Sequence, residues 1–192
     1  MMAGTRKSAP AEREVLLTFL GRIFGNGAAK DRARYEPLYR GLVAAGRDRA
    51  WYTGGAVPDS VQGRFDMIAA IFAIALIRLE AEGAAARQAS VLLAELFIDD
   101  MEGSLRQMGT GDLMVGKHLG KMMGALGGRL GAFRTALEAG GDLSAPVTRN
   151  IFHDAPPSPE AVDFVAGRLG GFARALDETP AEAILEGRIP AL

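Results

Sequence analysis

Apolar residues recur along most of the chain at intervals of three and four, the spacing that gathers them on one face of an α-helix. No segment alternates apolar and polar residues convincingly, as a half-buried strand would. The pattern therefore predicts an all-α protein, a single compact bundle of about six to seven helices. Glycine and proline breaks give the expected helices these approximate bounds: residues 11–24, 30–45, 60–82, 85–108, 112–139, 147–152 and 159–176, with a final turn or two at 180–186.

The expected helix over residues 60–82 is apolar on every side at its centre. Its apolar run extends over eleven residues, from Met67 to Ile77. A helix that crosses a membrane needs about 20 apolar residues, so this run predicts a buried helix at the centre of the bundle. Asp59 or Ser60 is expected to cap its N-terminus.

The expected helix over residues 112–139 has two different faces. One face carries large apolar residues at steps of three and four: Val115, Leu119, Met122, Leu126, Leu130, Phe133 and Leu137. Another side carries glycines at steps of four: Gly116, Gly120, Gly124 and Gly128. Each glycine inside a helix costs about 0.8–1 kcal/mol relative to alanine. Close packing of another backbone against the glycines is expected to offset this cost, and that backbone is either a helix of the same bundle or a helix of a foreign protein.

Acidic residues share one side of the preceding helix at positions i, i+4 and i+7, and a basic residue follows one turn later: Glu95, Asp99, Glu102 and then Arg106. A glycine-rich turn folds this helix back against the next one. The antiparallel register then predicts that Asp99 faces Lys121, and that Glu102 lies beside Lys117 or His118. Surface ion pairs contribute only about 0–1 kcal/mol each, so their expected role is to fix the register of the hairpin.

Catalytic chemistry has little support in the sequence. The chain has no cysteine, and its two histidines, His118 and His153, lie far apart without an acidic group to orient them. The Glu-x-x-His motif of carboxylate di-iron sites does not occur. No catalytic, cofactor-binding or metal-binding residue is therefore predicted, and the protein is not expected to be an enzyme. The enzymatic alternative is a helical isoprenoid-type lipid-processing enzyme that holds magnesium diphosphate with Asp99 and Asp100, although no second acidic motif is present.

Charge is distributed in blocks although the net charge is only −1. Residues 1–50 carry ten Lys and Arg against five Asp and Glu, whereas residues 51–112 carry four against nine. Such a pattern favours protein contacts, and no nucleic-acid sequence recognition is expected, because that requires a strongly basic domain. The basic first fifty residues leave a membrane-surface scaffold as another alternative. With no signal peptide recognisable, a cytoplasmic location is expected, with peripheral contact at the cytoplasmic face of the inner membrane allowed.

The predicted hairpin also carries a family resemblance. The residues concerned are Glu95-Leu96-Phe97-Ile98-Asp99-Asp100-Met101-Glu102, Leu105-Arg106-Gln107-Met108-Gly109-Thr110-Gly111-Asp112, Val115-Gly116-Lys117 and Met122, preceded by Trp51-Tyr52, Pro58-Asp59 and Gly63-Arg64-Phe65-Asp66. In this order they resemble the ubiquinol–cytochrome c chaperone family over about residues 35–137. The chain departs from the family's pattern at Gln107 and Thr110, where Glu and Val are expected.

The resemblance implies a non-enzymatic chaperone that helps newly made cytochrome b enter the cytochrome bc1 complex, the ubiquinol–cytochrome c reductase of the respiratory chain. Mitochondrial relatives act with a small partner protein and near the ribosome, and the absence of a transit segment suggests a bacterial member. The expected partner is cytochrome b or its assembly intermediate. The residues expected to bind it are Arg106, Asp112, Lys117, Lys121, Gly116, Gly120 and Gly124.

The expected helices and the extent of the resemblance together divide the chain into three expected regions. Residues 1–27 form an N-terminal helix or arm, and residues 28–140 form the chaperone-like helical domain. Residues 141–192 form a C-terminal helical appendage packed on that domain, beyond the part that carries the resemblance.

Overall fold

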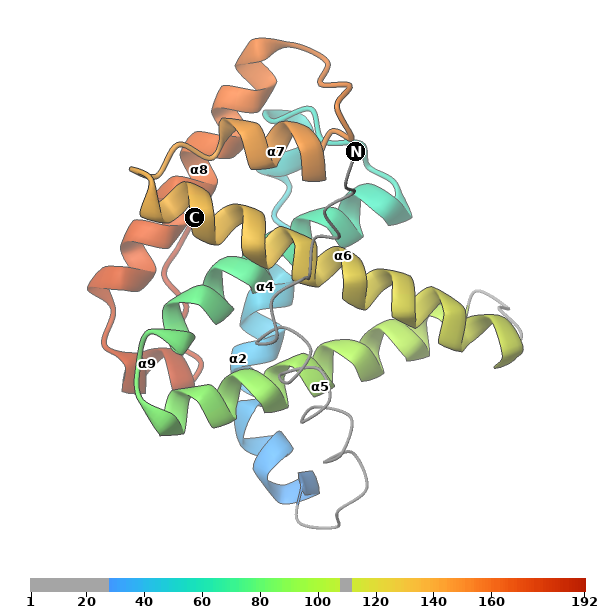
Figure 1. Ribbon diagram of the computed structural model, residues 1–192, viewed down its shortest axis with the longest axis vertical. Helices are drawn as coiled ribbons and strands as arrows, with labels where there is room; N and C mark the ends of the chain where they lie inside the picture. Colours follow the sequence, from blue (N-terminus) through green and yellow to red (C-terminus); the bar gives the residue numbers. More distant parts are fainter. Residues whose placement is uncertain (1–27, 108–111) are drawn as a thin grey trace, which may run out of the picture.

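The structure is a computed structural model that describes residues 28–107 and 112–192. These residues form eight helices and no strand, which confirms the all-α prediction (Figure 1). The helices have the following bounds: α2 (Ala28–Gly46), α3 (Ala50–Thr53), α4 (Val61–Glu80), α5 (Ala84–Gln107), α6 (Asp112–Glu138), α7 (Ser144–Asn150), α8 (Pro159–Glu178) and α9 (Ala181–Leu185). The predicted N-terminal arm at 1–27 and the glycine-rich turn at 109–111 lie outside the described residues.

The expected central helix is α4. Ser60 caps it, because its hydroxyl accepts a hydrogen bond from the backbone N of Gly63 at 3.1 Å. Every residue from Met67 to Leu76 is buried, and α2, α5, α6 and α8 all pack against this helix. Because α4 is covered on all sides, the prediction of a buried central helix is confirmed.

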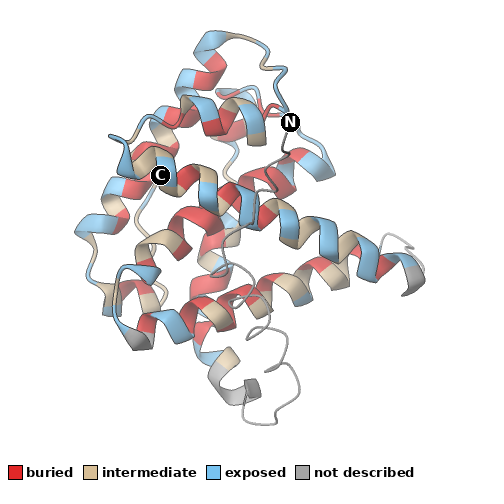
Figure 2. Ribbon diagram, in the orientation of Figure 1, coloured by how far each residue is buried: buried red, intermediate tan, exposed pale blue. Residues whose placement is uncertain are grey.

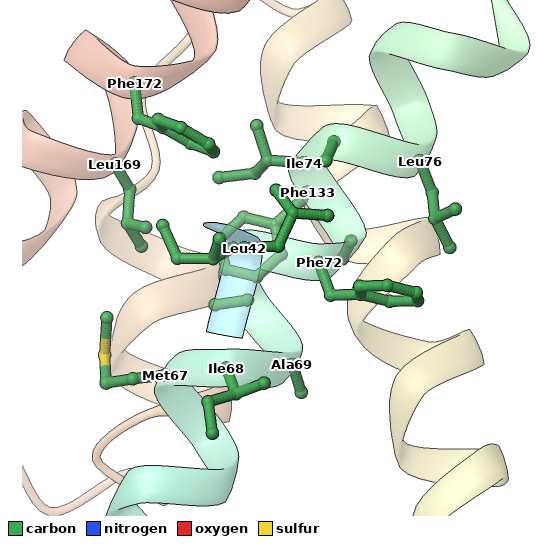
Figure 3. Close-up of a cluster of buried hydrophobic side chains, with 14 of the residues drawn as sticks. Leu42, Met67, Ile68, Ala69, Phe72, Ile74, Leu76, Phe133, Leu169 and Phe172 are labelled. Carbon is green, nitrogen blue, oxygen red and sulfur yellow. The ribbon is translucent and has the colours of Figure 1, made fainter. Parts of the chain in front are cut away.

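The hydrophobic core forms where these helices meet α4. Figure 3 shows Leu42 of α2, Phe133 of α6 and Phe172 of α8 gathered about α4, and all three side chains are fully buried. Phe72 of α4 stacks on Phe97 of α5 with ring centroids 5.0 Å apart. Aromatic and branched side chains from four different helices therefore interlock around one central element.

The C-terminal helices share this core. Ser158 caps α8 by accepting a hydrogen bond from the backbone N of Ala161 at 3.3 Å. The buried face of α8 packs against α4 and α7. Arg78 of α4 donates to the backbone oxygens of Leu176 and Thr179 at the end of α8, at 3.1 and 3.3 Å. The end of α8 is therefore tied to the central helix by hydrogen bonds as well as by apolar contact.

Helices α5 and α6 form an antiparallel hairpin that extends beyond the other helices in the view of Figure 1. Near its outer end, Leu105 and Val115 are buried but do not belong to the main core cluster. The inner half of the hairpin is therefore anchored in the core, and the outer half is packed separately. In the part of the chain that the structure describes, no helix is both long enough and apolar enough to span a membrane.

Candidate functional site

The glycines of α6 form one continuous stripe on the exposed side of the helix. Gly127 and Gly131 join the four glycines predicted from the sequence, and all six are exposed. At 100° per residue these positions fall within an arc of about 120°, and the sixteen residues that they span cover about 23 Å of helix. We call this surface the glycine face of α6; its members are Gly116, Gly120, Gly124, Gly127, Gly128 and Gly131.

No described part of the protein packs against the glycine face. A Cβ atom added at any of the six glycines would meet no heavy atom of the described residues within 4 Å. The first expected explanation of these glycines, a neighbouring helix of the same bundle, is therefore wrong for residues 28–107 and 112–192. Together the six glycines make α6 less stable by about 5–6 kcal/mol than a helix with alanine at these positions.

The opposite side of α6 packs into the protein as predicted. Leu126 and Phe133 are buried in the main core, and Leu119, Met122, Leu130 and Leu137 pack against it while partly exposed. Exposed residues recur at successive turns along the other side of the helix (Figure 2). The helix is thus held by one face, and its glycine face is left open.

The ion pairs predicted across the hairpin are wrong. Asp99 pairs with Arg32 of α2, whose Nε also lies 3.9 Å from a carboxylate oxygen of Glu95. Glu102 pairs along its own helix with Arg106, at 2.9 Å. Helix α2 packs against α5 and places a guanidinium among the acids that the hairpin register assigned to the lysines.

The predicted partner-binding residues lie along the exposed hairpin. Lys117 and Lys121 are exposed beside the glycine face, and neither forms an ion pair with a residue that the structure describes. Arg106 is exposed near the end of α5. Asp112 begins α6, but its side chain lies outside what the structure describes. The hairpin therefore presents bare backbone with two lysines at its edge.

The aspartate pair of the enzymatic alternative links helices. Asp100 accepts a hydrogen bond from the hydroxyl of Tyr39 at 2.7 Å, and Asp99 is paired with Arg32. Burial, and then this contact with Asp100, raise the pKa of Tyr39. Among the described residues, no group of three or more His, Cys, Asp or Glu is placed to hold a metal ion. The geometry of Asp99 and Asp100 therefore gives no support to a magnesium–diphosphate site.

A buried ionic cluster joins α4, α6 and the segment after α7, and the sequence analysis missed it. Asp66 of α4 is 0% exposed and pairs with Arg129 of α6, which is 3% exposed. Gln62 also donates to this carboxylate, at 2.9 Å, and the guanidinium lies 5.5 Å from the centre of the Phe65 ring. The available signal was a charged residue, Arg129, on the apolar side of a helix.

The cluster continues to the protein surface through the segment that follows α7. The Nε2 of exposed His153 lies 2.9 Å from the second carboxylate oxygen of Asp66. The expectation that His153 has no acidic partner is therefore wrong: the partner lies 87 positions earlier in the chain. Arg129 also donates to the backbone oxygen of Asn150 at 3.0 Å, so one guanidinium contacts two different helices.

Burial disfavours the charged forms of Asp66 and Arg129. It raises the pKa of Asp66, although Arg129, His153 and Gln62 pull that pKa down. Burial also lowers the pKa of Arg129, against the effect of Asp66. The Nε of Arg129 is buried and has no hydrogen-bond partner among the described residues. Both ions therefore carry a desolvation cost that their pairing only partly offsets.

Comparisons with known proteins agree on one family. A family model described as ubiquinol-cytochrome C chaperone matches residues 54–191. The crystal structure of the Cbp3 homolog from Brucella abortus is similar, with a TM-score of 0.74 and 30% sequence identity. The alignment covers 93% of this chain and 96% of that one. No curated protein sequence matches the chain. The family match continues through the C-terminal helices, past residue 137, where the resemblance found in the sequence ended.

Proposed function

Because the chain belongs to the ubiquinol-cytochrome C chaperone family, we propose that it is an assembly factor for the cytochrome bc1 complex. Its client is newly made cytochrome b, or an early assembly intermediate that contains it. The protein acts by binding and release and performs no catalysis. We place this action in the cytoplasm, with peripheral contact at the inner face of the membrane that receives cytochrome b.

The observation that supports a docking site is the open glycine face of α6. From Gly120 to Gly131 this face carries no side chain that would keep another helix at a distance, so two backbones can approach closely and gain many van der Waals contacts. Close approach also permits weak Cα–H···O contacts between the two helices. Apolar helices of cytochrome b, still without their final neighbours, are suitable occupants of this face.

The energetic cost of the glycines supports the same proposal. Within the described residues, none of the six positions needs glycine for lack of space, and alanine would stabilise the helix. A partner that requires close approach gives a reason for glycine that the protein's own folding does not.

The lysines at the edge of the glycine face give the proposed site a positive charge. Lys117 and Lys121 can meet acidic groups that flank an apolar client helix. We assign Arg106 and Asp112, at the outer end of the hairpin, to the same surface. Charged groups at the edge of an interface mainly accelerate and orient the encounter, whereas the glycine face carries the affinity.

Bulky side chains on the glycine face provide the direct test. Gly120→Leu and Gly124→Leu are expected to leave the protein folded, because their Cβ atoms enter open space and leucine favours helix over glycine. Both variants should reduce co-purification of cytochrome b at least tenfold. The matched control is Gly167→Leu on α8, another exposed helical glycine with open space around it, and this variant should retain capture. Wild-type capture by both folded α6 variants would reject the docking face.

Deletion of the gene tests the assembly role itself. The reduced spectrum of membranes from the deletion strain should show lowered b-type haem, because the proposal makes the assembly of cytochrome b depend on this protein. Gly167→Leu should restore the spectrum, and Gly120→Leu should not. Normal levels of cytochromes b and c1 in the deletion strain would exclude the chaperone role.

A further inference from the structure

The side of α6 that faces the core carries one fixed polar contact among many apolar ones. Arg129 lies about 160° around the helix from the middle of the glycine face. Its neighbours on that side are apolar residues such as Leu126 and Met122. Apolar contact has no preferred direction, and methionine adapts readily to a changed neighbour, so these contacts specify the rotation of α6 less sharply than a directional polar contact does.

The contacts of Arg129 do not permit such a turn. Its Nη2 donates to Asp66 of α4 and also to the backbone oxygen of Asn150, at the end of α7. The two acceptors belong to different helices, so both bonds are kept only in one rotation and one axial position of α6. His153 and Gln62 hold the carboxylate of Asp66 in place from two further directions.

We infer that the buried pair of Asp66 and Arg129 sets the rotation of α6, and so keeps its glycine face turned to solvent. The two are positioning residues for the proposed docking surface. The biological meaning of this role rests on the proposed function, but the rotation itself is a property of the protein alone.

Stability alone does not account for the pair. Both side chains are buried, and the Nε of Arg129 lacks a hydrogen-bond partner among the described atoms. Apolar residues of similar volume often replace such a pair without loss of stability. The best-attested use of a buried polar contact is to select one register among several that apolar packing allows.

A second ion pair between the same two helices provides the matched control. Glu80 of α4 pairs with Arg134 of α6, five positions beyond Arg129. Their side chains are 40% and 39% exposed, so solvent competes with the contact and its removal leaves no buried charge. If any ion pair between α4 and α6 could set the rotation, this pair would do so as well.

Single cysteines can report the rotation, because the chain has no cysteine of its own. The test compares Gly124→Cys, on the glycine face, with Leu126→Cys, at a position that is 3% exposed. In the otherwise wild-type full-length chain, a maleimide should modify the first at least ten times faster than the second. In Asp66→Leu/Arg129→Met, with helix content and cooperative melting retained, this ratio should fall below three. Glu80→Gln/Arg134→Gln should keep the wild-type ratio.

An unchanged ratio in the folded double variant would overturn the inference. If the double variant does not fold, Arg129→Lys decides, because lysine keeps the charge but its shorter side chain does not reach as far as the Nη2 that contacts both acceptors. It should lower the ratio at least twofold, and a wild-type ratio would overturn the inference as well. The proposed function fails separately: loss of the ratio with capture of cytochrome b intact would reject the docking face and leave the positioning role standing.

Discussion

At the end of α2, a Cβ on Gly46 would lie 2.6 Å from the Cα of Ile68, whereas a Cβ on Gly124 of α6 would meet no described heavy atom within 4 Å. The first glycine is needed because two backbones of this chain, in α2 and α4, touch there. The second is not needed by any contact that the structure describes. The difference shows that a glycine in a helix has two separate explanations, and that only contact geometry distinguishes them.

The largest effect on stability is expected from removal of Arg129. This change tests whether the inner side of α6 is packed as closely as the contact between α2 and α4. Arg129→Met leaves the carboxylate of Asp66 buried without its guanidinium, and should lower the free energy of unfolding by about 3–5 kcal/mol. Urea denaturation followed by circular dichroism measures this loss. Asp66→Leu/Arg129→Met should recover most of it, because no unpaired charge remains.

The loss of unfolding free energy in Arg129→Met should also depend on pH. Burial raises the pKa of Asp66 above its unfolded value of about 3.9 although Arg129 lowers it, so removal of Arg129 raises this pKa further and the folded variant holds the proton more tightly than the wild type does. Stability is therefore lost as the pH rises through the raised pKa, and the deficit should shrink towards pH 4. A deficit that stays constant with pH would mean that lost packing, and not the unpaired charge, is its cause.

A methyl group at the contact of α2 and α4 should have the next largest effect. Gly46→Ala forces the backbone of Ile68 to move, which should cost about 1–3 kcal/mol of unfolding free energy. Gly167→Ala is the control, with a Cβ in open space on α8, and should raise the free energy of unfolding by about 0.5–1 kcal/mol. Equal stabilities for the two variants would remove the distinction between the two kinds of glycine.

The same methyl on the glycine face should have the opposite sign. Gly124→Ala should raise the free energy of unfolding by about 0.5–1 kcal/mol, because alanine favours the helix and meets nothing. Thermal melting of the full-length chain measures the gain. A loss of stability would reveal that part of the same chain does cover the glycine face.

The lysines should have the smallest effect on stability. Lys117→Ala/Lys121→Ala should change the free energy of unfolding by less than about 0.5 kcal/mol, since both side chains are exposed. Capture of cytochrome b should become slower and less sensitive to salt. Arg149→Ala, an exposed base on α7, should leave the salt dependence as it is. An unaltered salt dependence in the lysine variant would place both lysines outside the interface.

Features that depend on neighbours in sequence could be predicted. The run from Met67 to Leu76 is apolar in every direction, so it indicated a central helix without knowledge of its partners. The apolar face of α6 followed from the same periodicity. Between the helices expected over residues 30–45 and 60–82 no helix was predicted, but the structure has the four-residue helix α3 there, which is too short to give a periodic signal.

Features that depend on distant residues could not be predicted. Pairing Asp99 with Lys121 considered only the two helices of the hairpin, but Arg32, 67 positions away, takes that carboxylate. The contact of His153 with Asp66 likewise has no local signal. The glycine stripe was visible in the sequence, whereas its exposure needed coordinates. The assignment of Arg106, Asp112, Lys117, Lys121, Gly116, Gly120 and Gly124 to partner binding stays a prediction.

The separate packing of Leu105 and Val115 at the outer end of the hairpin has a consequence for motion. Local opening there breaks few apolar contacts and leaves the main core intact, so the outer turns of α5 and α6 can unfold and refold while the rest of the protein stays native. Under the proposed function, the adaptable outer end would adjust to an arriving polypeptide, and the part of the hairpin anchored in the core would orient it.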